Sequence, residues 1–95
     1  MPRRSRDEGS PDGLPPLPMD EATWQAVAAA LALSGQQRRI VELILRGRQD
    51  KQIAKALDLS VPTVRTYLTR VFVRTNTEDR LGLVLRVFAL SQGRG

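Results

Sequence analysis

The side chains best suited to chemistry lie in one short stretch, residues 50–74, with the sequence DKQIAKALDLSVPTVRTYLTRVFVR. Two segments with helical periodicity are joined there by the turn Asp58, Leu59, Ser60. The outer side of the second segment carries Arg65, Thr66, Thr69 and Arg70. These groups offer hydrogen bonds and positive charge but neither a strong base nor an activated nucleophile. The stretch therefore predicts recognition, and it has the outline of a helix-turn-helix that places one helix in the DNA major groove.

The composition of the 95-residue chain disfavours an enzyme. It has no Cys and no His, which removes disulfides, thiolate metal ligands and the commonest general base. No carboxylates cluster at catalytic spacing, so we expect no catalytic residue, metal or cofactor. A chain of this size builds one small core, so its function should reside on a surface. The longest apolar run near the N-terminus, residues 26–33, is too short to cross a bilayer, which predicts a cytoplasmic protein without a membrane partner.

Charge is divided unevenly along the chain. Residues 1–33 hold three Arg against five acids, whereas residues 34–95 hold twelve Arg or Lys against five acids. The second part is therefore more basic than the whole chain, whose formal net charge is +5. This asymmetry favours a polyanionic partner, because phosphate neutralisation supplies most nonspecific affinity for nucleic acids. A solubilising surface is the alternative that charge alone leaves open.

Residues 1–18 are predicted to form a disordered tail. They contain five of the six prolines and few large apolar residues, so they offer little to bury. Their cluster of Arg3, Arg4 and Arg6 could reach a minor groove as an arm, although a solvated terminus is the simpler interpretation.

The remainder is predicted to be all-α, with an N-terminal helix in residues 19–33 and a helix-turn-helix domain in residues 34–92. The first helix should start at Asp20 and use Trp24 as a core anchor. A second helix is expected over 36–46, with Ser34 and Gln37 as a capping box and Gly47 as its left-handed end. A third should run over 51–57 with Asp50 as its cap.

The recognition helix is predicted over residues 61–74, with Pro62 in its first turn, where proline is tolerated. Its buried side should contain Val64, Leu68 and Val71. The same periodicity directs the polar residues outward: Thr63, Arg65, Thr66, Thr69 and Arg70.

A last helix is expected over residues 80–90 with Asp79 as its cap, and it is more apolar than one buried stripe requires. A homodimer across this helix would explain the excess, with a dimer interface on one side and further apolar residues on the other. The interface side holds Leu83, Val87 and Leu90, and the other side holds Leu81, Leu85 and Phe88. Packing against the helix that carries Trp24 is the alternative, and the sequence leaves both open.

Residues 33–89 resemble the LuxR-type (also called GerE-type) helix-turn-helix domain over matched segments rather than one short motif. The segments are LSGQQRRIVELILRG, QDKQIAKALDLS, PTVRTYLTRVF and DRLGLVLRVFAL. The sequence departs from the family pattern at Gln37, usually an acid, at Asp50, usually an uncharged cap, and at Thr75, usually apolar.

The resemblance implies a four-helix domain that binds double-stranded DNA as a dimer and regulates transcription, without enzymatic activity. By position it implies that Arg65, Thr66 and Thr69 approach base edges. It likewise implies phosphate contacts for Lys51, Thr63, Tyr67 and Arg70. With no sensor domain in these 95 residues, the chain is similar to free-standing members of the family.

Two other classes of function compete with this interpretation. A protein-interaction module, similar to sigma factor region 4, would dock on RNA polymerase or a co-regulator through the last helix, with DNA contact secondary. A fragment of an enzyme, such as the DNA-binding tail of a recombinase, would show no turnover alone.

Overall fold

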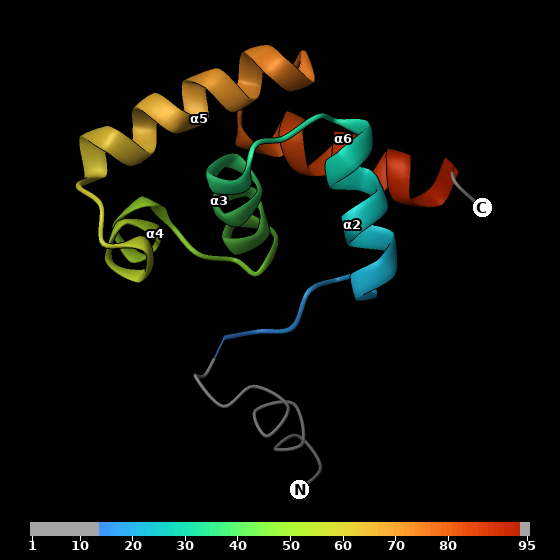
Figure 1. The fold of residues 1–95 in the computed structure, drawn as a ribbon, viewed down its shortest axis with the longest axis horizontal. Coiled ribbons are helices and arrows are strands. Elements are labelled where there is room, and N and C mark those ends of the chain that lie inside the picture. Colours follow the sequence, from blue (N-terminus) through green and yellow to red (C-terminus); the bar gives the residue numbers. More distant parts are fainter. Residues whose placement is uncertain (1–13, 94–95) are drawn as a thin grey trace, which may run out of the picture.

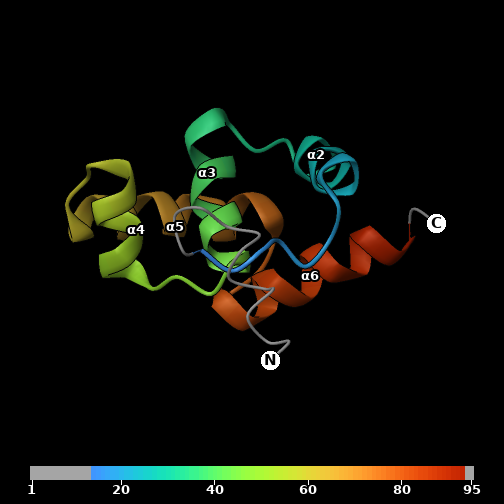
Figure 2. The same cartoon turned by 90° about the horizontal axis from the view of Figure 1, so that it is seen from below.

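A computed structural model describes residues 14–93, which form helices and, within that range, no strand. The helices are α2 (Glu21–Ala30), α3 (Gly35–Leu45), α4 (Asp50–Leu57), α5 (Val61–Thr75) and α6 (Arg80–Gly93). In both views α4 lies toward one end of the molecule and α2 and the C-terminal part of α6 toward the other, with α3 between them (Figures 1 and 2). The predicted all-α class, with an additional N-terminal helix, is confirmed. Within residues 14–93 no helix is long and apolar enough to span a membrane.

Four of the predicted helix starts are confirmed by their capping bonds. Asp20 accepts from the Thr23 amide at 2.8 Å, and Asp79 accepts from the Gly82 amide at 2.8 Å. Ser60 accepts from the Thr63 amide at 3.2 Å at the start of α5. At the start of α3 both bonds of the capping box form, from the Gln37 amide to Ser34 and back from the Ser34 amide to Gln37. Each bond satisfies an amide that the helix itself leaves unpaired.

The predicted cap of α4 is wrong by one residue. Gln49 is the N-cap and Asp50 is the first residue of the helix. The Gln52 side chain reaches back to accept from the Gln49 amide at 2.9 Å. Because a Gln in the third position satisfies this end of the helix, the Asp50 carboxylate is released for contacts with other helices.

Four of the described helices end next to a residue with a left-handed backbone conformation, among them α2, which is followed by Ala32 with φ 56°. Gly47 has φ 85°, as predicted, and Asp58 and Asn76 have φ 59° and 57°. Asp and Asn tolerate this region better than other residues with a β-carbon, which explains the sharp ends of α4 and α5.

One core runs through all the helices. Trp24, Ile40, Ile53, Val64 and Leu83 are fully buried, and Val71 and Val87 join them. Trp24 anchors α2 as predicted, and its Nε1 donates to Glu42 Oε1 of α3 at 3.2 Å. Thr75, the departure from the apolar pattern, is buried without an unpaired hydroxyl, because its Oγ1 donates to the Val71 carbonyl at 2.8 Å.

The face of α6 predicted to dimerise is occupied inside the single chain. Leu83 and Val87 are fully buried, Leu90 packs against the core, and α2 lies against α6. Leu83 and Val87 are therefore not exposed to a second copy, and α6 packs against the Trp24 helix, as the alternative predicted. The opposite side remains open, since Leu81 is 67% and Leu85 58% exposed.

The chain before α2 is described only in its last residues, 14–20. Residues 1–13, including the cluster of Arg3, Arg4 and Arg6, lie outside the described residues. Within the described part of this segment, Leu14 and Leu17 pack against the core, and Arg46 donates to the Pro15 carbonyl at 3.1 Å. Residues 14–18, the last part of the predicted tail, therefore lie against the folded domain.

Candidate nucleic-acid interface

Helices α4 and α5 form a helix-turn-helix, with close packing between them. The turn closes on the end of α4, where the Leu59 amide donates to the Ala54 carbonyl at 2.8 Å. Ala54 is only 5% exposed, and Ile53 beside it is fully buried. A small side chain at this crossing lets the two helices approach closely, so the orientation of α5 depends on α4.

The inner side of α5 is buried, as its periodicity predicts. Val64 and Val71 are inaccessible to solvent and Leu68 is 5% exposed. The intervening positions must then project outward. Arg65, Thr66 and Thr69, the predicted base-reading residues, are all exposed on this outer side, and so is Arg70.

The two threonines use their hydroxyl protons within the helix. Thr66 Oγ1 donates to the Pro62 carbonyl and Thr69 Oγ1 donates to the Arg65 carbonyl, both at 3.1 Å. What remains for a ligand is the methyl group and the lone pairs of the oxygen. A methyl group suits apolar contact with the methyl of thymine.

The residues predicted to contact phosphate are less uniform. Lys51 is exposed in the first turn of α4, where the helix dipole is positive, and Arg70 is exposed on α5. Thr63 and Tyr67 are half-buried. Thr63 Oγ1 accepts from the capping hydroxyl of Ser60 at 2.9 Å, and Tyr67 packs partly against the core.

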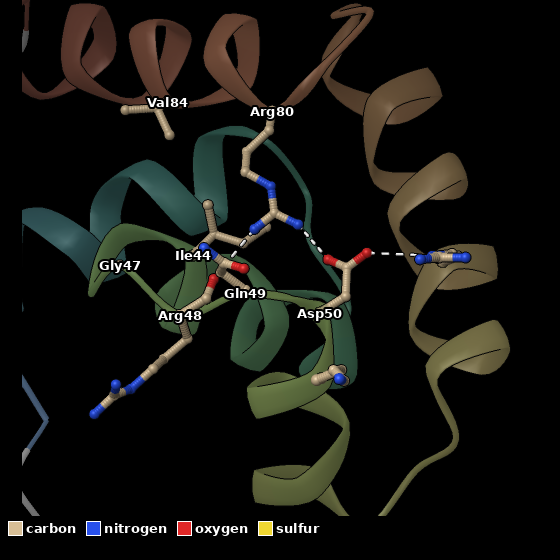
Figure 3. Close-up of a pocket in the computed structure, with 9 residues that line it drawn as sticks. Ile44, Gly47, Arg48, Gln49, Asp50, Arg80 and Val84 are labelled. Atoms are coloured by element: carbon tan, nitrogen blue, oxygen red, sulfur yellow. Dashed lines mark hydrogen bonds and ion pairs between the residues drawn. The ribbon is translucent and has the colours of Figure 1, made fainter.

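A hollow of about 540 Å³ opens beside the start of α4 and brings several cations together (Figure 3). Its charged residues are Arg48, Asp50, Lys51, Arg65 and Arg80. Asp50 Oδ2 accepts from Arg65 Nε at 3.3 Å, and Asp50 Oδ1 accepts from Arg80 Nη2. Arg80 Nη1 also donates to the Arg48 carbonyl at 3.2 Å. The hollow is therefore basic overall, with one carboxylate at its centre.

Sequence reasoning missed the part played by Arg80. It lies on α6, 30 residues from Asp50, and only the fold brings the two together. Arg48 and Arg74 were also unassigned, although both line hollows next to predicted DNA contacts, Arg74 together with Thr69 and Arg70. The weak signal available beforehand was the excess of basic residues after residue 33.

The fold and the exposed side of α5 define a helix-turn-helix protein. The chain belongs to the family described as "Bacterial regulatory proteins, luxR family", which it matches over residues 31–87. This match confirms the resemblance inferred from the sequence. It begins after α2, covers α3, α4 and α5 completely and includes α6 as far as residue 87.

Several curated proteins are similar to this chain. It is 38% identical over 56 residues to the "Monoamine regulon transcriptional regulator" of Klebsiella aerogenes, covering 59% of this chain and 25% of that protein. It is 35% identical over 63 residues to the "Response regulator Rre1" of Synechocystis sp., covering 66% of this chain and 26% of that protein.

A further relative is the "Probable transcriptional regulator ycf29" of Porphyra purpurea, 37% identical over 54 residues, which are 57% of this chain and 26% of that protein. The chain thus spans about a quarter of the length of each of these relatives. No solved structure matches it significantly.

Proposed function

We propose that this domain binds double-stranded DNA to regulate transcription, with α5 in the major groove. The observation that carries the proposal is the division of α5 into two sides. Its apolar side is buried in the core, while Arg65, Thr66 and Thr69 are exposed together on the other side. Membership of the luxR family of regulatory proteins supports it. This function places the protein in the cytoplasm, with RNA polymerase as a partner at the promoter.

In this proposal the base-reading and positioning groups have separate tasks. Arg65 takes the O6 and N7 atoms of a guanine in a fork, and the threonine methyl groups meet thymine methyls. Lys51 and Arg70 neutralise phosphates of the DNA backbone. Thr63, at the start of α5, and Tyr67, in its middle, also contact that backbone. The nonspecific part of the affinity then comes from the basic residues of the hollow and of α5.

Titration of duplex DNA at two salt concentrations tests the proposal. We expect binding to both random and promoter-derived duplexes, with the logarithm of affinity falling by about 0.9 per phosphate contacted for each tenfold rise in salt. Selection from a random duplex pool should then yield a preferred sequence. Undetectable binding at low salt to every duplex would refute the proposed function.

The proposal includes a homodimer formed through the open side of α6. Leu81 and Leu85 lie four positions apart and are mostly exposed, so they form a short apolar stripe that a second copy can bury. The predicted interface is therefore transferred from Leu83 and Val87, which the core occupies, to this side. Leu90 packs against the core at the far end of the helix.

Leu85→Asp should abolish dimer formation without unfolding the domain, because the residue is 58% exposed and contributes little to the core. Analytical ultracentrifugation of the wild type and the variant, with and without DNA, measures this. Ala29→Asp, at an exposed position of α2, is the matched control and should leave the dimer intact. A wild-type protein that stays monomeric at every concentration, also on DNA, would contradict the dimer.

A further inference from the structure

Asp50 is an acid in the middle of a surface otherwise suited to phosphate. Its side chain is 24% exposed and lies between Arg65 on α5 and Arg80 on α6 (Figure 3). Lys51 and Arg48 line the same hollow. A surface that served only to hold the DNA backbone would gain from an uncharged residue here, because a carboxylate repels phosphate groups.

Asp50 on α4 connects two other helices, because it pairs with Arg80 on α6 and with Arg65 on α5. Of these two arginines, Arg80 is the more restrained and Arg65 the more exposed. Arg80 is held from two sides, since it donates to the Arg48 carbonyl and to Asp50. Asp50 itself begins α4, so its position depends on that helix. Arg65 is 70% exposed and would otherwise sample many rotamers. The carboxylate therefore restrains the one long, flexible side chain among the predicted base-reading residues.

The atom that Asp50 contacts on Arg65 is also informative. The hydrogen bond engages Nε, at 3.3 Å from Oδ2. The two terminal nitrogens of a guanidinium form a separate pair of donors, and this pair suffices for an end-on fork to guanine. Restraint by Asp50 and base recognition by Arg65 are therefore compatible at the same time.

We propose that Asp50 is a positioning residue that determines DNA specificity. Resting on the proposed function, the inference is that Asp50 holds Arg65 ready for a guanine and, through its charge, weakens binding wherever DNA offers phosphate contacts alone. Preordering lowers the entropy lost when Arg65 meets its base. With a guanine, Arg65 stays paired with Asp50, whereas in a nonspecific complex Arg65 turns to a phosphate and leaves the Asp50 charge exposed to the DNA backbone. The repulsion therefore falls mainly on nonspecific complexes, so the difference between specific and nonspecific affinity increases.

The test compares Asp50→Asn with the wild type on the preferred duplex and on a random duplex. The amide keeps the size and one acceptor oxygen of Asp50, so Arg80 retains a partner. We expect roughly three- to tenfold tighter binding to random DNA, since one repulsive charge is removed beside the phosphates. The preference, measured as the ratio of the affinities for the selected and the random duplex, should fall by at least the same factor. The salt slope should steepen by up to about 0.9 as the released Arg65 takes a phosphate.

Asp58→Asn is the matched control, because it removes the same charge at an exposed, left-handed residue that Asn also tolerates. It should change neither the preference nor the salt slope. Thermal unfolding monitored by circular dichroism establishes that all variants are folded, and Asp50→Ser serves as a second variant if the Asn variant is unstable.

A double-mutant comparison shows whether Asp50 acts through Arg65. In an Arg65→Ala background the Asp50→Asn change should no longer lower sequence preference, although it should still strengthen binding to random DNA. If the wild type shows a preferred sequence and Asp50→Asn behaves like Asp58→Asn, the role of Asp50 is disproved while the proposed function stands. Failure of the wild type to bind any duplex would refute the proposed function itself, and this inference with it.

Discussion

Trp24→Ala is expected to lower the free energy of unfolding by about 3 to 5 kcal/mol, the cost of removing a large aromatic side chain from a core. Trp24 is fully buried in α2, and its ring reaches α3, where Nε1 donates to Glu42. The substitution removes the ring that fastens α2 to the rest of the domain and also takes from Glu42 one of its two partners. Arg46, at 3.2 Å from Glu42 Oε2, remains as the other.

Urea denaturation followed by far-UV circular dichroism measures this loss. Fluorescence is unsuitable because Trp24 is the only Trp in the chain. Trp24→Phe keeps an aromatic ring but no hydrogen-bond donor, so it should cost about 1 to 2 kcal/mol. Ala29→Gln, at an exposed position of the same helix, should change stability by less than about 0.5 kcal/mol. A stability of Trp24→Ala within 1 kcal/mol of the wild type would mean that α2 unfolds independently.

The position of α2 has a consequence for assembly. The family match begins at residue 31, so α2 lies before the shared domain, yet it belongs to the same core. It packs against α6, whose Leu83 and Val87 are buried in this core. A dimer through α6 is therefore limited to the side of Leu81 and Leu85, unless α2 moves away. Stability measured for Trp24 variants thus also estimates how firmly that side of α6 is closed.

Local features of the sequence were sufficient to predict the helices and the exposed face of α5. Caps such as Ser34 and Asp79 act within three residues, and the buried series Val64, Leu68 and Val71 follows from helical periodicity alone. The exposed face of α5, with the predicted base-reading residues, is the complement of that series. It could therefore be placed without knowledge of where the other helices lie.

Features set by tertiary contacts could not be predicted in the same way. Helix α6 is apolar on more than one side, so periodicity could not decide whether Leu83 or Leu85 faces the core. The ion pair from Asp50 to Arg80 joins residues 30 positions apart, and nothing in either neighbourhood indicates it. Leu14 and Leu17 lie among prolines, but a neighbouring apolar surface was available to them once the helices had assembled.

Arg65→Ala should weaken binding to the preferred duplex by about 1 to 3 kcal/mol and relax the preference at one base pair, the loss typical of one bidentate contact to a guanine. Arg65 is the only one of the three predicted base-reading residues that carries charge, and Thr66 and Thr69 have their hydroxyl protons committed to the helix. Selection from a random pool with the variant identifies which position is relaxed. An equal loss of affinity for every duplex sequence would indicate that Arg65 contacts a phosphate instead of a base.

Lys51→Ala provides the contrast that separates reading from positioning. Lys51 lies in the first turn of α4 without a predicted base contact, so its loss should weaken all duplexes similarly and reduce the salt slope by about 0.9. The loss of affinity caused by Arg65→Ala has a second component. The substitution leaves Asp50 paired with Arg80 alone, so more of the negative charge of Asp50 faces the DNA backbone. Measuring Arg65→Ala in the Asp50→Asn background removes that component, and the difference between the two backgrounds is the free energy of coupling between the two residues.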